Sequence, residues 1–193
     1  MPVSNWSIPE TTTRTGASHA RRGVVCQDAS GWRSLQDRSG KPVHLMVVAD
    51  GHGGKRYTQS DVGSKFACEV ALNLLTEQLA RWSSVGNGSP QRWQEWLEGP
   101  FPKVLHQRWL AAIEDHWKQD PELSEADFSP VPYGTTLALV VMTLAWWAHS
   151  GLGDWDLVRI TPDGEAELVN QEEEEEQTGG EATFSLCLRN APQ

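Results

Sequence analysis

The chain of 193 residues is 38% hydrophobic and 22% charged, which is enough for one globular domain, 1–193, with a hydrophobic core. Its formal net charge is −10, and the acidic run 172–176 supplies half of it, which argues against nucleic-acid backbone binding as a main role. The N-terminus lacks the pattern of a signal peptide and no apolar stretch is long enough to span a bilayer, which predicts a cytoplasmic protein that does not enter membranes.

The first third of the chain is predicted to contain two strands that each end near an acidic residue. A loop leads into a short strand, 24–29, and turn residues fill 31–42. The apolar run 43–49 predicts a buried strand. Asp28 and Asp50 are therefore expected on two neighbouring strands.

The middle of the chain is predicted to be helical. Apolar residues recur every three or four positions across 57–82 and again across 91–119, where two prolines interrupt the second helical region. Two polar segments that contain turn-forming residues, 83–90 and 120–132, are predicted to be loops.

Tryptophan is unusually frequent, with ten in the chain, and five of these lie in the helical part. We expect them to fill contacts between helices and sheet, because large aromatic side chains mostly fill cores, and a tryptophan-lined ligand surface is the alternative. The five are Trp82, Trp93, Trp96, Trp109 and Trp117.

After residue 132 the sequence returns to strand patterns. The acidic segment 170–180 is predicted to be a mobile loop, because like charges repel each other and resist packing. Strands before and after long helices predict an α+β fold with antiparallel sheets and helices packed on a face. The predicted strands are 135–142, 145–151, 156–161, 165–169 and 183–188.

The run Asp50-Gly51-His52-Gly53-Gly54 places an acid and an imidazole in a glycine-rich turn directly after the buried strand. A carboxylate in such a place needs a counter-charge, which a divalent cation can supply. Gly51 lets a backbone carbonyl oxygen reach the same ion because it has no Cβ to block the approach. Asp-Gly after a strand is also common in hairpin turns, so these five residues alone leave both interpretations open.

Four segments occur in an order that points to one family: 16–28, 47–54, Gly134-Thr135-Thr136-Leu137 and Gly153-Asp154. With these segments the chain resembles the metal-dependent protein phosphatases of the protein phosphatase 2C type, in a bacterial-like branch, over about residues 14–188. The resemblance implies an antiparallel β-sandwich flanked by helices on both faces.

The resemblance also implies hydrolysis of phosphoserine and phosphothreonine esters of phosphoprotein substrates, at a centre where two Mn²⁺ or Mg²⁺ ions activate a water. Asp50 would bridge both metals, Gly51 would bind one through its carbonyl oxygen, and Asp28 would contribute its carboxylate or bound waters. His52 would protonate the departing oxygen as general acid. Asp154 would lie near a weaker third metal position.

The sequence departs from this family in two places. The eukaryotic pattern has a phosphate-binding arginine where this chain has Gly23, so the adjacent Arg22 is the candidate phosphate-binding residue, and a solvated pair of arginines is the alternative. Two further metal-binding acids are expected after Asp154, but the chain ends at Gln193 without them. The prediction is the N-terminal two-thirds of a phosphatase domain, incomplete at its C-terminus, with a weakened metal site.

Three functions stay open at this stage. The leading hypothesis is a metal-dependent serine/threonine phosphatase that acts as a monomer. The alternative, which the missing acids motivate, is a non-catalytic phosphatase-like module that binds phosphoproteins or a regulatory partner. The third is a metal-free carbohydrate- or aromatic-binding domain that uses the tryptophans, and it leaves the Asp50 turn unexplained.

Overall fold

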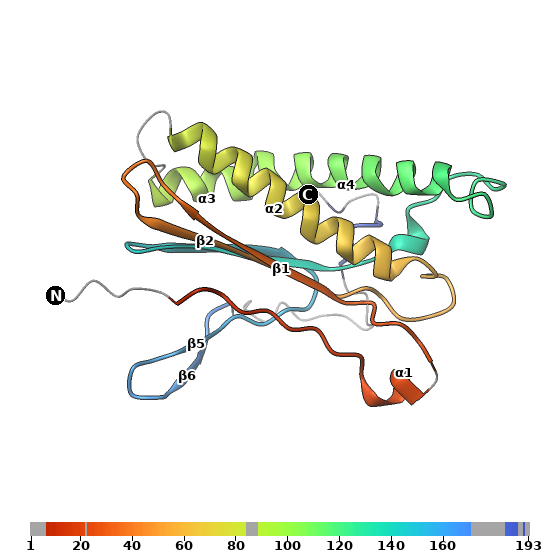
Figure 1. Ribbon diagram of the computed structural model, residues 1–193, viewed down its shortest axis with the longest axis horizontal. Helices are drawn as coiled ribbons and strands as arrows, with labels where there is room; N and C mark the ends of the chain where they lie inside the picture. Colours follow the sequence, from red (N-terminus) through yellow and green to blue (C-terminus); the bar gives the residue numbers. More distant parts are fainter. Residues whose placement is uncertain (1–6, 22, 84–88, 171–183, 189–190, 192–193) are drawn as a thin grey trace, which may run out of the picture.

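The computed structural model describes residues 7–21, 23–83, 89–170, 184–188 and 191 (Figure 1). Its elements are, in chain order, α1 (Ala17–Arg21), β1 (Ala29–Gln36), β2 (Pro42–Ala49), α2 (Ser60–Ser83), α3 (Pro90–Glu98), α4 (Pro100–Gln119), the 3-10 helix η1 (Val131–Tyr133), β3 (Leu137–Thr143), β4 (Trp147–Leu152), β5 (Val158–Ile160) and β6 (Ala166–Leu168).

Four strands form an antiparallel sheet in the order β1-β2-β3-β4, with β2 and β3 at its centre. The register pairs Ala29 with Ala49 and Val48 with Ala138, so the start of β1, the end of β2 and the start of β3 meet at one end of the sheet. Helices α2, α3 and α4 cover one face (Figure 1). The α+β fold class with an antiparallel sheet is therefore confirmed.

The core lies between this face and the helices. Val43, Leu45 and Val47 of β2 alternate along the strand and are each at most 3% exposed, because residues two apart point to the same side of a sheet. Leu75 of α2 and Ile113 of α4 are fully buried in the same core. Apolar burial of this extent is the main term that holds the helices on the sheet.

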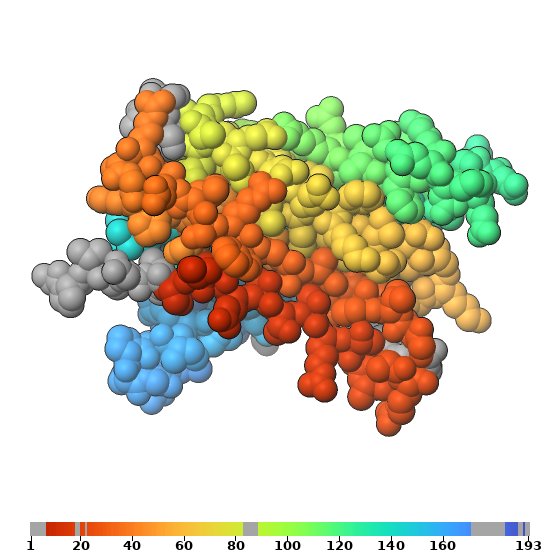
Figure 2. All heavy atoms as spheres, in the orientation of Figure 1, coloured from red at the N-terminus to blue at the C-terminus, as the bar shows by residue number. Residues whose placement is uncertain are grey.

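The other face of the sheet lies toward the N-terminal segment and a second, two-stranded sheet formed by β5 and β6 (Figure 1). Figure 2 shows the β5–β6 hairpin projecting from the body of the molecule. Met46 and Val140 on this face line an apolar cleft together with Val158 and Ile160 of the hairpin. Residues 161–164 form the turn that joins β5 to β6, with the Gly164 amide donating to the Thr161 carbonyl oxygen at 2.9 Å.

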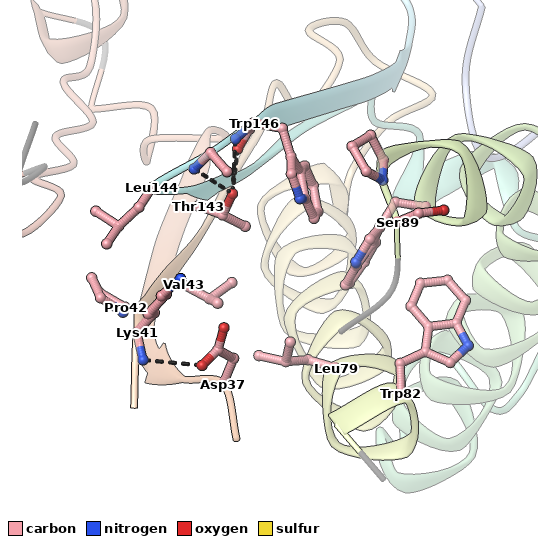
Figure 3. A pocket seen from close by; sticks show the side chains of 13 residues that line it. Asp37, Lys41, Pro42, Val43, Leu79, Trp82, Ser89, Thr143, Leu144 and Trp146 are labelled. Atoms are coloured by element: carbon pink, nitrogen blue, oxygen red, sulfur yellow. Dashed lines mark hydrogen bonds between the residues drawn. The ribbon is translucent and has the colours of Figure 1, made fainter. Parts of the chain in front are cut away.

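The tryptophans of the helical part serve mainly in packing. Trp93 and Trp109 are at most 1% exposed, and Trp82 packs edge-to-face on Trp93 with ring centroids 4.9 Å apart. Trp82, Trp93 and Trp146 also line a pocket of about 530 Å³ at the end of the sheet where the β1–β2 and β3–β4 turns lie (Figure 3). The prediction that these side chains fill the core is confirmed for Trp82, Trp93, Trp109 and Trp117.

The predicted bounds of the first strand are wrong. The strand begins at Ala29 and runs through residues that the sequence suggested were turn, so Asp28 directly precedes it. β1 is an edge strand with few apolar residues, and its Arg33 points to α2, where it donates hydrogen bonds to Asn73 at 2.6 Å and Thr76 at 2.9 Å. Because an arginine takes an inward position of β1, the strand lacks the alternation of apolar and polar residues that would have predicted it.

Four other predictions concern the loops and the last strand. Residues 184–188 form a turn, closed by the Leu188 amide donating to the Ser185 carbonyl at 3.1 Å, so a strand there is wrong for the described residues. The segment 120–132 is a loop up to η1, as predicted. Most of the predicted loops at 83–90 and 170–180 lies outside the described residues.

Within the part of the chain that the structure describes, no helix is long and apolar enough to cross a bilayer.

Substitution of Gly63 tests the packing of α2. A Cβ at Gly63 would overlap the carbonyl oxygen of Tyr133 and lie 2.8 Å from its carbonyl carbon. Overpacking of this kind costs about 1–3 kcal/mol, more than the roughly 1 kcal/mol that alanine gains in helix propensity. We expect Gly63→Ala to lower the free energy of unfolding, measured by urea denaturation, whereas Gly16→Ala, where nothing lies within 4 Å, leaves it nearly unchanged. An equally stable Gly63→Ala variant would contradict this packing.

Candidate functional site

The Asp50 turn is held by the segment that begins β3. The Asp50 carbonyl oxygen accepts hydrogen bonds from the Thr136 amide and the Thr135 hydroxyl, each at 2.9 Å. The Asp50 amide donates to the Thr136 hydroxyl at 3.0 Å, and the His52 amide donates to the Gly134 carbonyl at 3.0 Å. Because these bonds use the backbone of the turn, the side chains of Asp50 and His52 are left for other partners.

Gly51 is buried where three segments of backbone meet. A Cβ at this position would overlap the carbonyl oxygen of Gln27 and lie 2.7 Å from that of Ser60. Only glycine lets the turn approach the segment before β1 and the start of α2 so closely. The backbone of the turn is therefore fixed in place.

Asp28 lies directly beside Asp50 because β1 and β2 pair at Ala29 and Ala49. Asp50 as a whole is exposed, but its carboxyl group is partly enclosed by protein. This partial burial, the charge of Asp28, a hydrogen bond with Asp28 and the charge of Asp154 raise the pKa of Asp50 to about 6. The Cys26 thiol also donates to the Asp28 carboxylate, with Sγ 3.7 Å from Oδ2.

Asp154 reaches this site through a glycine turn. Gly153 has a φ of +102°, and a Cβ there would lie 2.5 Å from the Thr136 methyl group. The turn thus packs against the segment that holds Asp50 and brings the Asp154 charge within electrostatic range of both Asp50 and His52.

His52 is half-buried beside an aromatic ring and two opposite charges. Its ring packs edge-to-face on Tyr57, with centroids 4.9 Å apart. Partial burial lowers the pKa of His52, the Asp154 charge raises it and the Arg56 charge lowers it, with a net decrease. The imidazole is therefore mostly neutral at neutral pH.

The donor set fits a hard divalent cation. Carboxylate and carbonyl oxygens are the ligands of Mg²⁺, and the pKa of Asp50 is raised first by partial burial and then by the neighbouring acids Asp28 and Asp154. Among the described residues, however, no group of three or more His, Cys, Asp or Glu side chains is arranged to hold a metal ion. Within the described part of the chain, the site thus offers the adjacent carboxyl groups of Asp28 and Asp50, on which the charge of Asp154 acts.

A comparison with family models decides the family. The model described as Protein phosphatase 2C matches residues 15–193. The chain belongs to the protein phosphatase 2C family. Neither the search of curated proteins nor the search of solved structures returned a match. Family membership confirms the predicted resemblance and supports a phosphatase function in general.

The structure brings five of the predicted phosphatase site residues to one end of the sheet: Asp28, Asp50, Gly51, His52 and Asp154. Arg22 lies outside the described residues, so its predicted role in phosphate binding stays a prediction.

Sequence reasoning treated some residues of this site only as parts of motifs, or passed over them. Thr135 and Thr136 were matched to a family segment, yet their place in the structure is to hold the Asp50 backbone. Gln27 entered only as part of the segment 16–28, and Ser60 was passed over, although Gln27 contacts both the Asp50 turn and α2. The position of Gln27 next to Asp28 is the one sequence feature that could have drawn attention to it.

The raised pKa of Asp50 predicts how stability changes with pH in the metal-free protein. The pKa of Asp50 in the folded protein, about 6, lies above the ordinary value of 3.8. The contribution of Asp50 to the free energy of unfolding is therefore fully present below about pH 3.8 and is lost as the pH rises through about 6. We expect Asp50→Asn to remove this loss. The measurement is the difference in free energy of unfolding between parent and variant across this window, which cancels the contribution of His52. A difference that is constant with pH would contradict the raised pKa.

Proposed function

We propose that the chain is a metal-dependent phosphatase that hydrolyses phosphoserine and phosphothreonine esters of phosphoproteins. The observation that carries this proposal is the adjacent pair Asp28 and Asp50, with His52 on the same turn, in a chain of the protein phosphatase 2C family. An acid pair without a cation beside it is costly, and a divalent ion at this place would relieve the cost.

Mn²⁺ or Mg²⁺ would be held by the carboxylates of Asp28 and Asp50 and by the carbonyl oxygen of Gly51. Asp154, which is exposed, would lie near a further and weaker cation position. When bound, such ions supply a water activated for attack on a phosphate ester. The chain itself contributes the rigid turn that keeps these oxygen atoms in one place.

His52 would donate a proton to the oxygen that leaves with the serine or threonine side chain. An alkoxide is a poor leaving group, so protonation as it departs accelerates the reaction. The Asp154 charge favours the protonated imidazole, against the net decrease in pKa that burial causes. Because only the protonated imidazole can donate a proton, turnover should fall as the pH rises above the pKa of His52.

One observation favours the alternative, a non-catalytic module that binds phosphoproteins. No three candidate ligand side chains are grouped to hold a metal in the described part of the chain. This alternative predicts binding of a phosphopeptide without release of phosphate at any Mn²⁺ concentration, and the proposed phosphatase predicts release.

Substitution of Asp50 tests the proposed chemistry. Loss of an outer-shell partner of a metal site costs up to about 100-fold in activity, so we expect Asp50→Asn, which changes a proposed ligand, to lower Mn²⁺-dependent hydrolysis of a phosphothreonine peptide by at least that factor. Asp156→Asn is the matched control, since Asp156 is exposed on the same loop as Asp154 and is not among the groups that act on Asp50. Equal hydrolysis by parent and Asp50→Asn would overturn the proposal.

Substitution of His52 separates proton donation from the rest of the reaction. General acid catalysis contributes about 10²–10⁴-fold, so His52→Gln should lower kcat for a phosphoserine peptide by about 100-fold or more. Hydrolysis of an aryl phosphate should fall much less, because an aryl oxide leaves without a proton. Steady-state kinetics with both substrates makes the comparison, and an equal loss on both would rule out the proposed role of His52.

A further inference from the structure

The side chain of Gln27 joins the two backbone segments that carry the acid pair. Gln27 is the residue before Asp28, and its Nε2 donates to the carbonyl oxygen of His52 at 3.2 Å. The same nitrogen donates to the Ser60 hydroxyl at 2.6 Å. Both hydrogens of the amide are thus used, one on the Asp50 turn and one on α2.

The backbone of Gln27 is held as firmly as its side chain. The Ser64 hydroxyl donates to the Gln27 carbonyl oxygen at 2.6 Å, and Ser60 and Ser64 are at most 1% exposed. Gly51 packs against the same carbonyl oxygen with no room for a Cβ. The first turn of α2 therefore fixes Gln27 at both ends, and Gln27 in turn fixes the Asp50 turn.

This arrangement matters because two carboxylates side by side repel each other. A turn that is free to move would relieve the repulsion by separating Asp50 from Asp28, and the spacing of the two acids would then vary. The hydrogen bonds from Gln27 oppose that movement, since His52 is two residues from Asp50 and Gln27 is bonded covalently to Asp28. A fixed spacing of ligands favours the binding of a cation because less order is lost on binding.

We propose that Gln27 is a positioning residue that sets the separation of Asp28 and Asp50 and, through it, the affinity of the site for a divalent cation. This inference rests on the proposed function, because it assumes that the acid pair binds a metal. Gln27 acts through the two acids and touches no reacting group.

The test makes the same change, from glutamine to methionine, at two positions of the full chain. Gln27→Met keeps the length of the side chain and removes both hydrogen bonds. Gln78→Met is the control, since Gln78 is a glutamine that is at least as well buried as the half-buried Gln27, at 7% exposed, and lies 18 positions after Ser60 on α2, roughly 27 Å along the helix. Two quantities are measured: the dissociation constant for Mn²⁺ by calorimetry, and hydrogen exchange of the amides of residues 50–54 without metal.

We expect Gln27→Met to bind Mn²⁺ about 10- to 100-fold more weakly than the parent, the effect typical of a lost outer-shell partner. Exchange at residues 50–54 should become faster in Gln27→Met and stay unchanged in Gln78→Met. A general loss of stability would affect both variants alike, so the contrast isolates positioning.

A folded Gln27→Met variant with parental Mn²⁺ affinity and parental exchange overturns the inference. If Gln27→Met does not fold, Ser60→Ala takes its place, and it must also weaken Mn²⁺ binding and speed exchange at residues 50–54. If the parent chain binds no Mn²⁺, the proposed function fails, and the exchange data alone decide whether Gln27 holds the turn.

Discussion

Asp28 and Asp50 are held within hydrogen-bonding reach of each other by the pairing of β1 with β2, although two carboxylates so placed repel each other. The fold maintains this arrangement with neutral hydrogen bonds. Thr135, Thr136 and Gly134 bind the backbone around Asp50 and His52, and Gln27 binds the turn from the other side. The polar contacts of the turn are thus made by its backbone, and within the described residues the charges that act on the Asp50 carboxyl group are those of Asp28 and Asp154.

The rigidity of the site comes from the core behind it. Ser60 and Ser64 stand on the first turn of α2, and α2 packs on the sheet through fully buried residues such as Ala71 and Leu75. Because a packed helix has little freedom to shift, the hydrogen bonds that start from it keep the Asp50 turn in register with Asp28. The aromatic packing around Trp82 and Trp93 stabilises the other end of the same helix.

Much of this fold could be predicted from the sequence, and the failures have physical causes. The apolar run before Asp50 and the helical periodicity after Gly54 gave β2, α2 and α4, because buried elements carry strong patterns. β1 was misplaced because an edge strand with an inward Arg33 lacks such a pattern. The motifs placed Asp28, Asp50, His52 and Asp154 in one site, but the part of Gln27 depends on Ser60, which only the tertiary fold brings near it.

The most direct test of this account is a calorimetric titration of the chain with Mn²⁺ in two buffers that differ in ionisation enthalpy. At about pH 6, where Asp50 is partly protonated, the account predicts binding of Mn²⁺ with release of protons, and at about pH 8 binding with no release from Asp50. Binding at about pH 6 without any release of protons would mean that Asp50 is not a ligand. The absence of any binding would contradict the claim that this acid pair is a cation site.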